Sequence, residues 1–252
     1  MTNQDGRRDA APMLELIGVS RRFGGLTVID HLDLTIGAGE IVGIIGPNGA
    51  GKTTLFNVIG GVLPPSGGRL VYRGRDITHM RVWDRSRLGI GRTYQVPKPF
   101  FKMSVYENVL AAAVHGGGLA VRQARDRAES VLDKTGLIHR ADLPAEQLSL
   151  LDLKRLELAK AMAQEPELLL LDEIAGGLTE AECDVVLDIV RDTHAHHGTT
   201  VVWIEHVIQA LRRIATRMVV LYGGGVIADD APDAVLADER VRAVYLGETE
   251  EV

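Results

Sequence analysis

The chain has 252 residues, of which 46% are hydrophobic and 25% are charged, and its formal net charge is −6. This apolar content excludes an intrinsically disordered chain, and the mild acidic balance argues against a nucleic-acid binder with a wholly basic surface. A chain of this length buries a substantial core, as one large domain or two small ones. The single cysteine, Cys183, excludes a disulfide framework and a cysteine zinc site, and it favours a reducing compartment.

The N-terminal residues and the lengths of the apolar runs indicate whether the chain carries a targeting or membrane-spanning segment. Residues 1–12 are polar and contain no apolar core of a signal peptide, so we expect a flexible N-terminus and no secretory leader. No stretch of 18 or more apolar residues occurs, so we expect no membrane-spanning helix.

The first part of the chain has the pattern of strands. Residues 13–20 and 27–36 alternate, and the second run predicts that Val28, Leu32, Leu34 and Ile36 share one face. An apolar run ending in glycines then predicts a buried strand, followed by a helix that ends at glycines and a further short strand. These three elements are expected at 40–46, 52–63 and 69–74.

The middle of the chain, from about residue 96 to 164, has few strand signals and predicts helices. One of them places Ala124, Ala128, Val131 and Leu132 on a single stripe, with charged residues opposite. After it, strands and helices alternate again, which predicts a largely parallel sheet covered on both faces and a helical insertion within it. The elements expected here are helices at 104–114 and 121–137, a helix starting near Ser149, strands at 167–172 and 199–205, helices at 179–197 and 206–215, a hairpin at 217–230 and two short terminal helices.

A phosphate-binding motif lies between the predicted buried strand and the helix after it. Residues 46–53 match G-x-x-x-x-G-K-[ST] at every fixed position. Glycines let the backbone wrap around phosphate oxygens, and the helix N-terminus adds N–H groups and a positive dipole end. Lys52 is expected to reach the β- and γ-phosphates and Thr53 to ligate Mg²⁺; a glycine-rich turn without a ligand is the alternative. The predicted ATP contacts are Gly46, Pro47, Asn48, Gly49, Ala50, Gly51, Lys52, Thr53 and Thr54.

A second apolar run, residues 168–171, ends in Asp172 and Glu173. A buried strand delivers carboxylates to the edge of a sheet where ligands bind in α/β folds. Alone, this pattern is typical of a plain strand terminus. Together with a phosphate loop, it predicts that Asp172 holds Mg²⁺ through a water and that Glu173 orients and deprotonates the attacking water.

From about residue 13 to 247, the chain resembles the ATP-binding subunits of ABC transporters. Phe23, in RRFGG, matches the aromatic ring that this family stacks on adenine. Gln95, in RTYQ, matches the glutamine that contacts Mg²⁺ and water and faces the membrane subunits. His206, in WIEH, matches the histidine that contacts the γ-phosphate. Taken singly, these are also patterns of a packing aromatic, a surface glutamine and a residue that caps a helix; their order along one chain favours the resemblance.

The segment that corresponds to the family's signature departs from it. The usual Leu-Ser-Gly-Gly-Gln is replaced by residues 148–152, LSLLD, so only Leu148 and Ser149 are kept. Ser149 is a good N-cap, with Asp152 at the capping-box position. The resemblance implies that Ser149 contacts the ATP of a partner subunit, but the leucine side chains add bulk and Asp152 adds negative charge near phosphate. Ile174 stands where the family usually has proline, and residues 176–179 also differ from the usual form.

Within the family, three segments resemble those of the branched-chain amino acid import ATPases, a group that includes urea and amide importers. These segments are RLELAKAMAQEPELLLLDE, AGGL and RAVYLGE. The resemblance implies one ABC-type P-loop domain over 13–247. Its RecA-like core covers 13–95 and 165–247, with an antiparallel β subdomain, and an inserted helical subdomain covers 96–164.

The resemblance also implies a function. It implies ATP hydrolysis with ATP and Mg²⁺, coupled to an importer at the cytoplasmic face of the inner membrane, to which the chain is peripheral. The implied partners are a like or paralogous ATP-binding subunit, two permease subunits and, indirectly, a solute-binding protein, with no nucleic acid. Two alternatives stay open: a non-transport ABC ATPase, and a nucleotide-binding regulatory subunit with weak hydrolysis.

Three further features are interpreted as structural. The histidines at 194, 196 and 197 are typical of a solvated helix end near the negative dipole pole, rather than of a metal site. Arginines at 122, 125 and 127 alternate with acids, which favours a solvated helix face over nucleic-acid binding. Cys183 lies on an amphipathic helix and is expected to pack.

Overall fold

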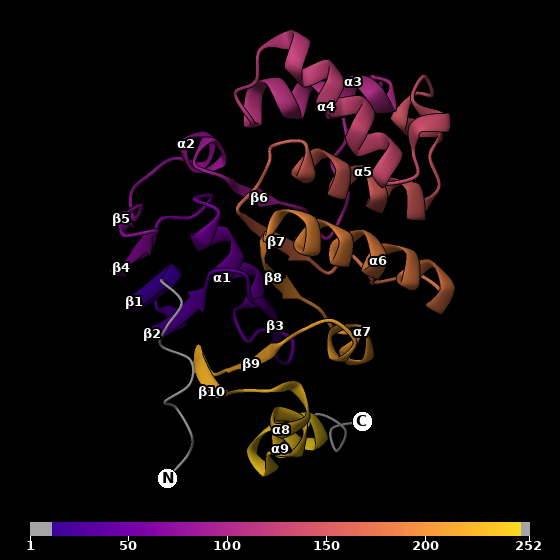
Figure 1. Ribbon diagram of the computed structural model, residues 1–252. Coiled ribbons are helices and arrows are strands. Elements are labelled where there is room, and N and C mark those ends of the chain that lie inside the picture. Colours follow the sequence, from indigo (N-terminus) through magenta and orange to yellow (C-terminus); the bar gives the residue numbers. More distant parts are fainter. Residues whose placement is uncertain (1–11, 248–252) are drawn as a thin grey trace. The chain divides into compact units, whose positions relative to one another are not determined.

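The computed structural model describes residues 12–247 (Figure 1). Most of the predicted flexible N-terminus therefore lies outside the described residues, but Pro12 does not, because it begins a strand and pairs with Gly37. The described residues form two compact units, one of residues 12–80 together with 215–247 and the other of Arg81–Ile214. These two units divide the chain at 80/81 and 214/215, and the predicted subdomain boundaries at 95/96 and 164/165 stay predictions.

The first unit contains an antiparallel sheet in the order β2-β1-β4-β5. Leucine and isoleucine side chains on one face of its two long strands are buried, which explains why these segments alternate in sequence. Its strands are β1 (Pro12–Phe23), β2 (Leu26–Gly37), β4 (Gly67–Tyr72) and β5 (Arg75–Asp76).

A bulge in β2 makes one part of the predicted strand pattern wrong. His31 has φ +44, and across it the pairing advances by two residues along β1 but by three along β2. This extra residue reverses the alternation, so that Ile29 is buried whereas Val28 is only half-buried. Leu32, Leu34 and Ile36, which lie beyond the bulge, are buried as predicted.

Strand β3 (Ile41–Ile45) of the same unit is buried along its whole length and leads into helix α1 (Lys52–Ile59). It pairs in parallel with β9 (Arg217–Tyr222), which forms the predicted hairpin with β10 (Gly225–Asp230). The two predicted terminal helices are α8 (Pro232–Ala237) and α9 (Glu239–Gly247).

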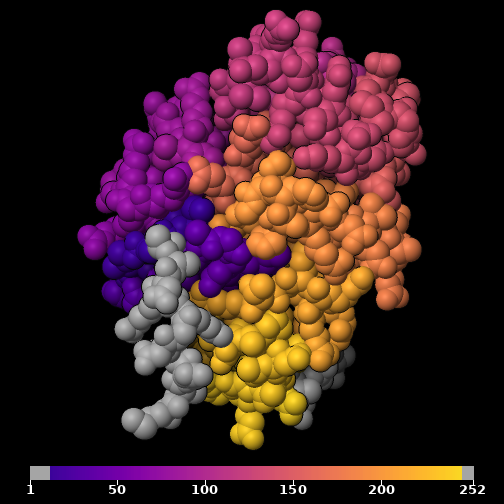
Figure 2. All heavy atoms as spheres, in the orientation of Figure 1, coloured from indigo at the N-terminus to yellow at the C-terminus, as the bar shows by residue number. Residues whose placement is uncertain are grey.

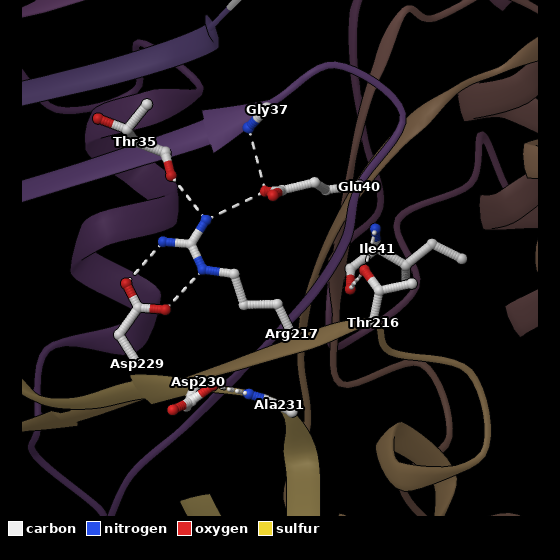
Figure 3. Close-up of polar contacts among 9 residues, drawn as sticks. All are labelled: Thr35, Gly37, Glu40, Ile41, Thr216, Arg217, Asp229, Asp230 and Ala231. Carbon is white, nitrogen blue, oxygen red and sulfur yellow. Dashed lines mark hydrogen bonds and ion pairs between the residues drawn. The ribbon is translucent and has the colours of Figure 1, made fainter. Parts of the chain in front are cut away.

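An arginine near the start of β9 joins four segments of this unit (Figure 3). The guanidinium of Arg217 donates two hydrogen bonds to Asp229, at 2.5 and 2.6 Å, one to Glu40 at 3.1 Å and one to the carbonyl of Thr35 at 2.9 Å. The Asp229 carboxylate raises the pKa of Arg217, so the guanidinium remains charged throughout the physiological range. The planar fork thereby ties the hairpin to β2 and to the turn before β3.

The second unit contains three parallel strands, with β7 between β6 and β8. Helices α2 and α5 contact β6, and α5 also contacts α6. The strands are β6 (Ile90–Arg92), β7 (Leu168–Asp172) and β8 (Thr200–Ile204); the helices are α2 (Val82–Arg87), α3 (Val105–Ala111), α4 (Val121–Lys134), α5 (Leu150–Met162), α6 (Glu180–His197) and α7 (Ile208–Arg212), with a π-helical turn η1 (Ala112–Gly116) and 3-10 turns η2 (Ile138–Arg140) and η3 (Ala145–Gln147).

The predicted helical stretch is present in this unit as α3, α4 and α5, each of which contacts the other two. Pink atoms from this part of the chain cover the top of the face drawn in Figure 2. The predicted apolar stripe of α4 is confirmed, because its four residues are all buried. Sequence reasoning missed α2 and β6, which are short and lack a clear period. The prediction that His206 opens a helix is wrong, since α7 begins at Ile208 and His206 lies in the loop before it.

Most of the residues interpreted above as structural are buried or make hydrogen bonds and ion pairs with neighbouring residues. Cys183 is buried on α6. His194 and His196 contact backbone carbonyls, and His197 contacts Lys134 at 3.2 Å. Arg127 forms an ion pair with Glu165 at 3.2 Å. None of the helices in the described part of the chain combines the length and hydropathy that a membrane crossing requires.

Candidate functional site

The phosphate loop of the first unit connects the C-terminal end of β3 to α1. Gly46 has φ +153 and Gly51 has φ +95. A Cβ atom on Gly46 would lie 2.3 Å from the carbonyl oxygen of Leu221, and one on Gly51 would lie 2.9 Å from that of Val28. Both positions therefore require glycine, because the backbone passes too close to its neighbours for a side chain.

Helix α1 begins at Lys52, and its N-cap, Gly51, provides no side-chain cap. The ammonium of Lys52 is buried and donates to the carbonyls of Gly46, at 2.5 Å, and Pro47, at 2.9 Å. The side chain of Thr53 is exposed. A tightly wrapped glycine loop, an ammonium and an uncapped helix start suit a polyphosphate, and an exposed hydroxyl beside them suits Mg²⁺.

The remaining residues of the predicted ATP contacts lie in the same unit. Asn48 and Gly49 are exposed at the tip of the loop, Pro47 and Ala50 are buried, and Thr54 is half-buried. Phe23 lies at the end of β1 with 43% of its surface exposed. The guanidinium of Arg21 lies 4.5 Å from the centroid of the Phe23 ring, so this exposed ring already has one cationic neighbour.

The second unit places the two predicted acids at the end of β7. Asp172 is 2% exposed, and its Oδ2 atom accepts a hydrogen bond from Arg92 at 3.0 Å. Its Oδ1 atom is buried without a hydrogen-bond partner among the described residues. Burial raises the pKa of Asp172, whereas the hydrogen bond from Arg92 lowers it. A buried carboxylate oxygen with no donor suits a hydrated cation, so Asp172 fits its predicted role.

Glu173, Gln95 and His206 come from three distant segments and meet in this unit. The Gln95 Nε2 atom donates to Oε2 of Glu173 at 2.5 Å, and the His206 Nε2 atom lies 2.7 Å from Oε1. Both carboxylate oxygens of Glu173 are therefore engaged, and 12% of its side chain remains exposed. Because Gln95 donates its N–H, its amide oxygen is left for a cation.

The backbone of Glu173 is unusual, since its φ of +47 lies in the left-handed region that non-glycine residues rarely adopt. Its N–H donates to the carbonyl of Ile204 at 2.9 Å, and its own carbonyl accepts from the ammonium of Lys154 at 2.8 Å. Backbone strain of this kind persists where the surroundings hold it, and it is concentrated at functional sites.

Sequence reasoning missed Lys154, Glu205 and Arg92 as neighbours of these residues. Lys154 is 5% exposed, and burial lowers its pKa, while the surrounding carboxylates act in the opposite direction. A lysine on the apolar side of a buried helix was the available signal for it. Arg92 stands three residues before Gln95, but nothing local indicated its partner.

Glu205 is a buried carboxylate that joins two loops. Its side chain is 1% exposed and accepts hydrogen bonds from the backbone N–H groups of Ala175 at 2.7 Å, His206 at 3.0 Å and Val207 at 3.4 Å. Burial raises the pKa of Glu205, and the N–H groups act against this. The loop after β7 is thereby tied to the loop that carries His206.

At the start of α5, the predicted N-cap is confirmed, whereas the predicted capping box and the predicted charge of Asp152 near phosphate are corrected. Ser149 is the N-cap and accepts from the N–H of Asp152. The reciprocal capping-box bond is replaced, because the Ser149 hydroxyl itself donates to the Asp152 carboxylate at 2.8 Å. Asp152 is 3% exposed and paired with both Arg140 and Arg155, so its charge is neutralised within the fold rather than presented outward. Leu150, by contrast, is 47% exposed.

Comparisons with known proteins give the family. Residues 29–176 match the ABC transporter family, and residues 226–251 match the branched-chain amino acid ATP-binding cassette transporter family. The chain is 36% identical to the high-affinity branched-chain amino acid transport ATP-binding protein LivG of Salmonella typhimurium, over 94% of this chain and 98% of that one. It is 32% identical to the lipopolysaccharide export system ATP-binding protein LptB of Escherichia coli, over 91% and 95%.

Solved structures agree with this relationship. The ADP conformation of an ATP-binding cassette of an ABC transporter superposes with a TM-score of 0.83 and 27% identity, covering 94% of this chain and 99% of that one. A dimeric cassette in a post-hydrolysis state with ADP and Pi gives a TM-score of 0.78 and 25% identity, covering 87% and 99%. The matched motifs and the full-length similarity show that this chain belongs to the ABC transporter ATP-binding family and is an ATPase with the P-loop fold of that family.

Proposed function

We propose that this ATPase is the motor subunit of an importer for branched-chain amino acids or related small solutes. The observation that carries the hydrolytic part is the arrangement of Glu173 between Gln95 and His206. The match of residues 226–251 to the branched-chain amino acid transporter family and the similarity to LivG support the solute class. The similarity to LptB, whose name denotes an export system, makes the direction of transport part of the proposal.

The proposed chemistry is phosphoryl transfer from ATP to water. Lys52 and the backbone N–H groups of the phosphate loop bind the phosphate charge, and Phe23 stacks on the adenine. Glu173 accepts the proton of the attacking water, with Gln95 and His206 holding its carboxylate in place. The proposed ligands of Mg²⁺ are the Thr53 hydroxyl, the Gln95 amide oxygen and, through water, Asp172; bound there, the ion supplies neutralisation of the phosphate charge.

The proposed partners are a second ATP-binding subunit and two permease subunits, with a solute-binding protein acting through the permease. The proposed location is the cytoplasmic face of the inner membrane, where the chain is peripheral. The dimeric relative supports the paired subunits. The exposed Leu150, where the family usually carries glycine, favours a paralogue as the second subunit, because a bulky side chain weakens the contact that this signature makes with ATP.

Co-purification tests this proposal. The tagged full chain is recovered from detergent-solubilised membranes, and its companions are identified by mass spectrometry. We expect two multi-span permease subunits and a second ATP-binding subunit; the solute-binding protein encoded with them is then screened against branched-chain amino acids, urea and amides. Recovery of the chain without any membrane protein, or with an export complex, would contradict the importer.

Ser149→Ala separates two roles of the signature serine. Loss of the N-cap is expected to lower the free energy of unfolding by about 1 kcal/mol. If Ser149 also contacts the partner's ATP, as the family resemblance implies, turnover of the assembled complex falls by more than the loss of the cap explains. The control is Ser104→Ala, since Ser104 caps α3 through a complete capping box. Denaturant unfolding measures the stability of both variants, and ATPase assays measure their turnover. Equal stability losses with unchanged turnover in both would show that Ser149 acts only as a helix cap.

A further inference from the structure

The side chain of Lys154 contacts the backbone of two of the three residues Glu173, Gln95 and His206. It extends from α5 and is 5% exposed, so a charged ammonium has been taken out of water. Burying an ammonium costs free energy unless it is compensated by hydrogen bonds and opposite charge. A buried lysine in this position therefore needs a structural or functional reason.

The hydrogen bonds of this ammonium go to the backbone of the site. The Nζ atom donates to the carbonyl of Glu173 at 2.8 Å and, more weakly, to that of Gln95 at 3.4 Å. The side chains of these same two residues are hydrogen-bonded to each other. One ammonium thus bridges the two peptide groups that carry the carboxylate and the amide of the site.

The peptide that Lys154 holds is the strained one. Glu173 has φ +47, and its N–H is anchored to the carbonyl of Ile204 on β8. The bond from Lys154 anchors the carbonyl of the same residue, so both polar groups of the Glu173 backbone are held. With the backbone held in this way, the carboxylate is directed at the amide of Gln95 on one side and the imidazole of His206 on the other.

The positive charge of Lys154 is opposite in sign to that of the carboxylates around it. The carboxylates of Asp172, Glu173 and Glu205 all act on it electrostatically. Three acids gathered at the ends of two neighbouring strands repel one another, and an ammonium among them reduces that repulsion. A neutral side chain of the same length would fill the space without providing either the hydrogen bonds or the charge.

We propose that Lys154 is a positioning residue for ATP hydrolysis. It holds the Glu173 and Gln95 peptides so that the Glu173 carboxylate stays within contact distance of the Gln95 amide and the His206 imidazole. The proposal rests on the proposed role of Glu173 as the general base. Lys154 itself does not touch the reacting atoms. It connects helix α5, whose N-cap is Ser149, to the backbone of the base, so the signature helix and the carboxylate are mechanically joined.

The test compares Lys154→Met with Lys160→Met. Lys160 lies on the same helix, and it also donates to a backbone carbonyl, that of Lys98 at 2.9 Å, and pairs with Glu157 at 2.6 Å. Lys154→Met is expected to lower kcat about 10- to 100-fold, the scale for loss of a residue that orients a reacting group, with the KM for ATP changed less than about threefold. Lys160→Met is expected to leave both constants within about twofold of the parent chain, because it lies outside the site. Lys154→Arg, which retains the charge and the donors, is expected to restore part of the rate.

A second readout needs neither ATP nor a partner subunit. The imidazole resonance of His206 is assigned in NMR spectra of the full chain by its disappearance in His206→Gln. Lys154→Met is expected to shift this resonance and Lys160→Met to leave it in place. An unmoved resonance, or a fall in kcat matched by an equal rise in KM, would overturn the positioning role. If the parent chain in its complex does not hydrolyse ATP, the proposed function fails, while the His206 resonance still reports on Lys154.

Discussion

Glu173→Gln is expected to lower the rate of ATP turnover by about 10² or more while ATP binding survives, because an amide cannot accept the proton of the attacking water. The substitution conserves the shape of the side chain. Its amide oxygen still accepts the hydrogen bond that Gln95 donates, so the loss is chemical rather than structural. The rate is measured in the assembled complex under saturating ATP, and binding is measured separately with a fluorescent nucleotide.

The matched control for this experiment is Glu180→Gln. Glu180 lies in the first turn of α6, is exposed, and has no place in the proposed chemistry. We expect its turnover to equal that of the parent chain. Unchanged turnover in Glu173→Gln would remove Glu173 from the role of general base and leave its contacts with Gln95 and His206 as structural ones.

Arg217→Met is expected to cost about 2–3 kcal/mol of unfolding free energy, somewhat less than the cost of breaking a fully buried pair. Only 13% of the Arg217 side chain is exposed, and its loss leaves Glu40 and Asp229 together without the cation that joins them. The carbonyl of Thr35 also loses its donor (Figure 3). The methionine retains most of the apolar stem, so the change reports on the guanidinium rather than on packing.

Denaturant unfolding of the full chain measures this loss. Arg240→Met, in the same unit, is the control: Arg240 pairs with Asp238 at 2.7 Å, but 70% of its side chain is exposed, so we expect no resolvable change. A second variant, Asp229→Asn, combined with Arg217→Met in a double-mutant cycle, isolates the bidentate contact. Equal effects of Arg217→Met and Arg240→Met would show that the four joined segments are held by other interactions.

The corrections to the predicted elements share a cause. Residues 27–36 alternate in sequence, yet the bulge at His31 moves Ile29, not Val28, into the core. Alternation is a local signal, and a bulge depends on how the neighbouring strand pairs. Likewise, the negative charge expected at Asp152 is neutralised by Arg155 on the same helix and by Arg140, which lies 12 residues earlier and outside that helix. The sequence of this helix alone therefore did not predict which charged residues surround Asp152.

The sequence alone determined the local parts of this protein. The phosphate loop is a run of consecutive residues that matches its motif at every fixed position, and the N-cap at Ser149 is a contact between residues three apart. The short apolar run of β3, IVGII, predicted a buried strand. The same sequence motifs, in their order, led to the family. Only the tertiary structure decided which polar groups meet: Gln95 with Glu173 across 78 positions, Arg92 with Asp172 across 80, and Lys154 with the strained Glu173 peptide. The physical reason is that these contacts depend on strand register and on the packing of α5, which are set by the whole core rather than by neighbouring residues.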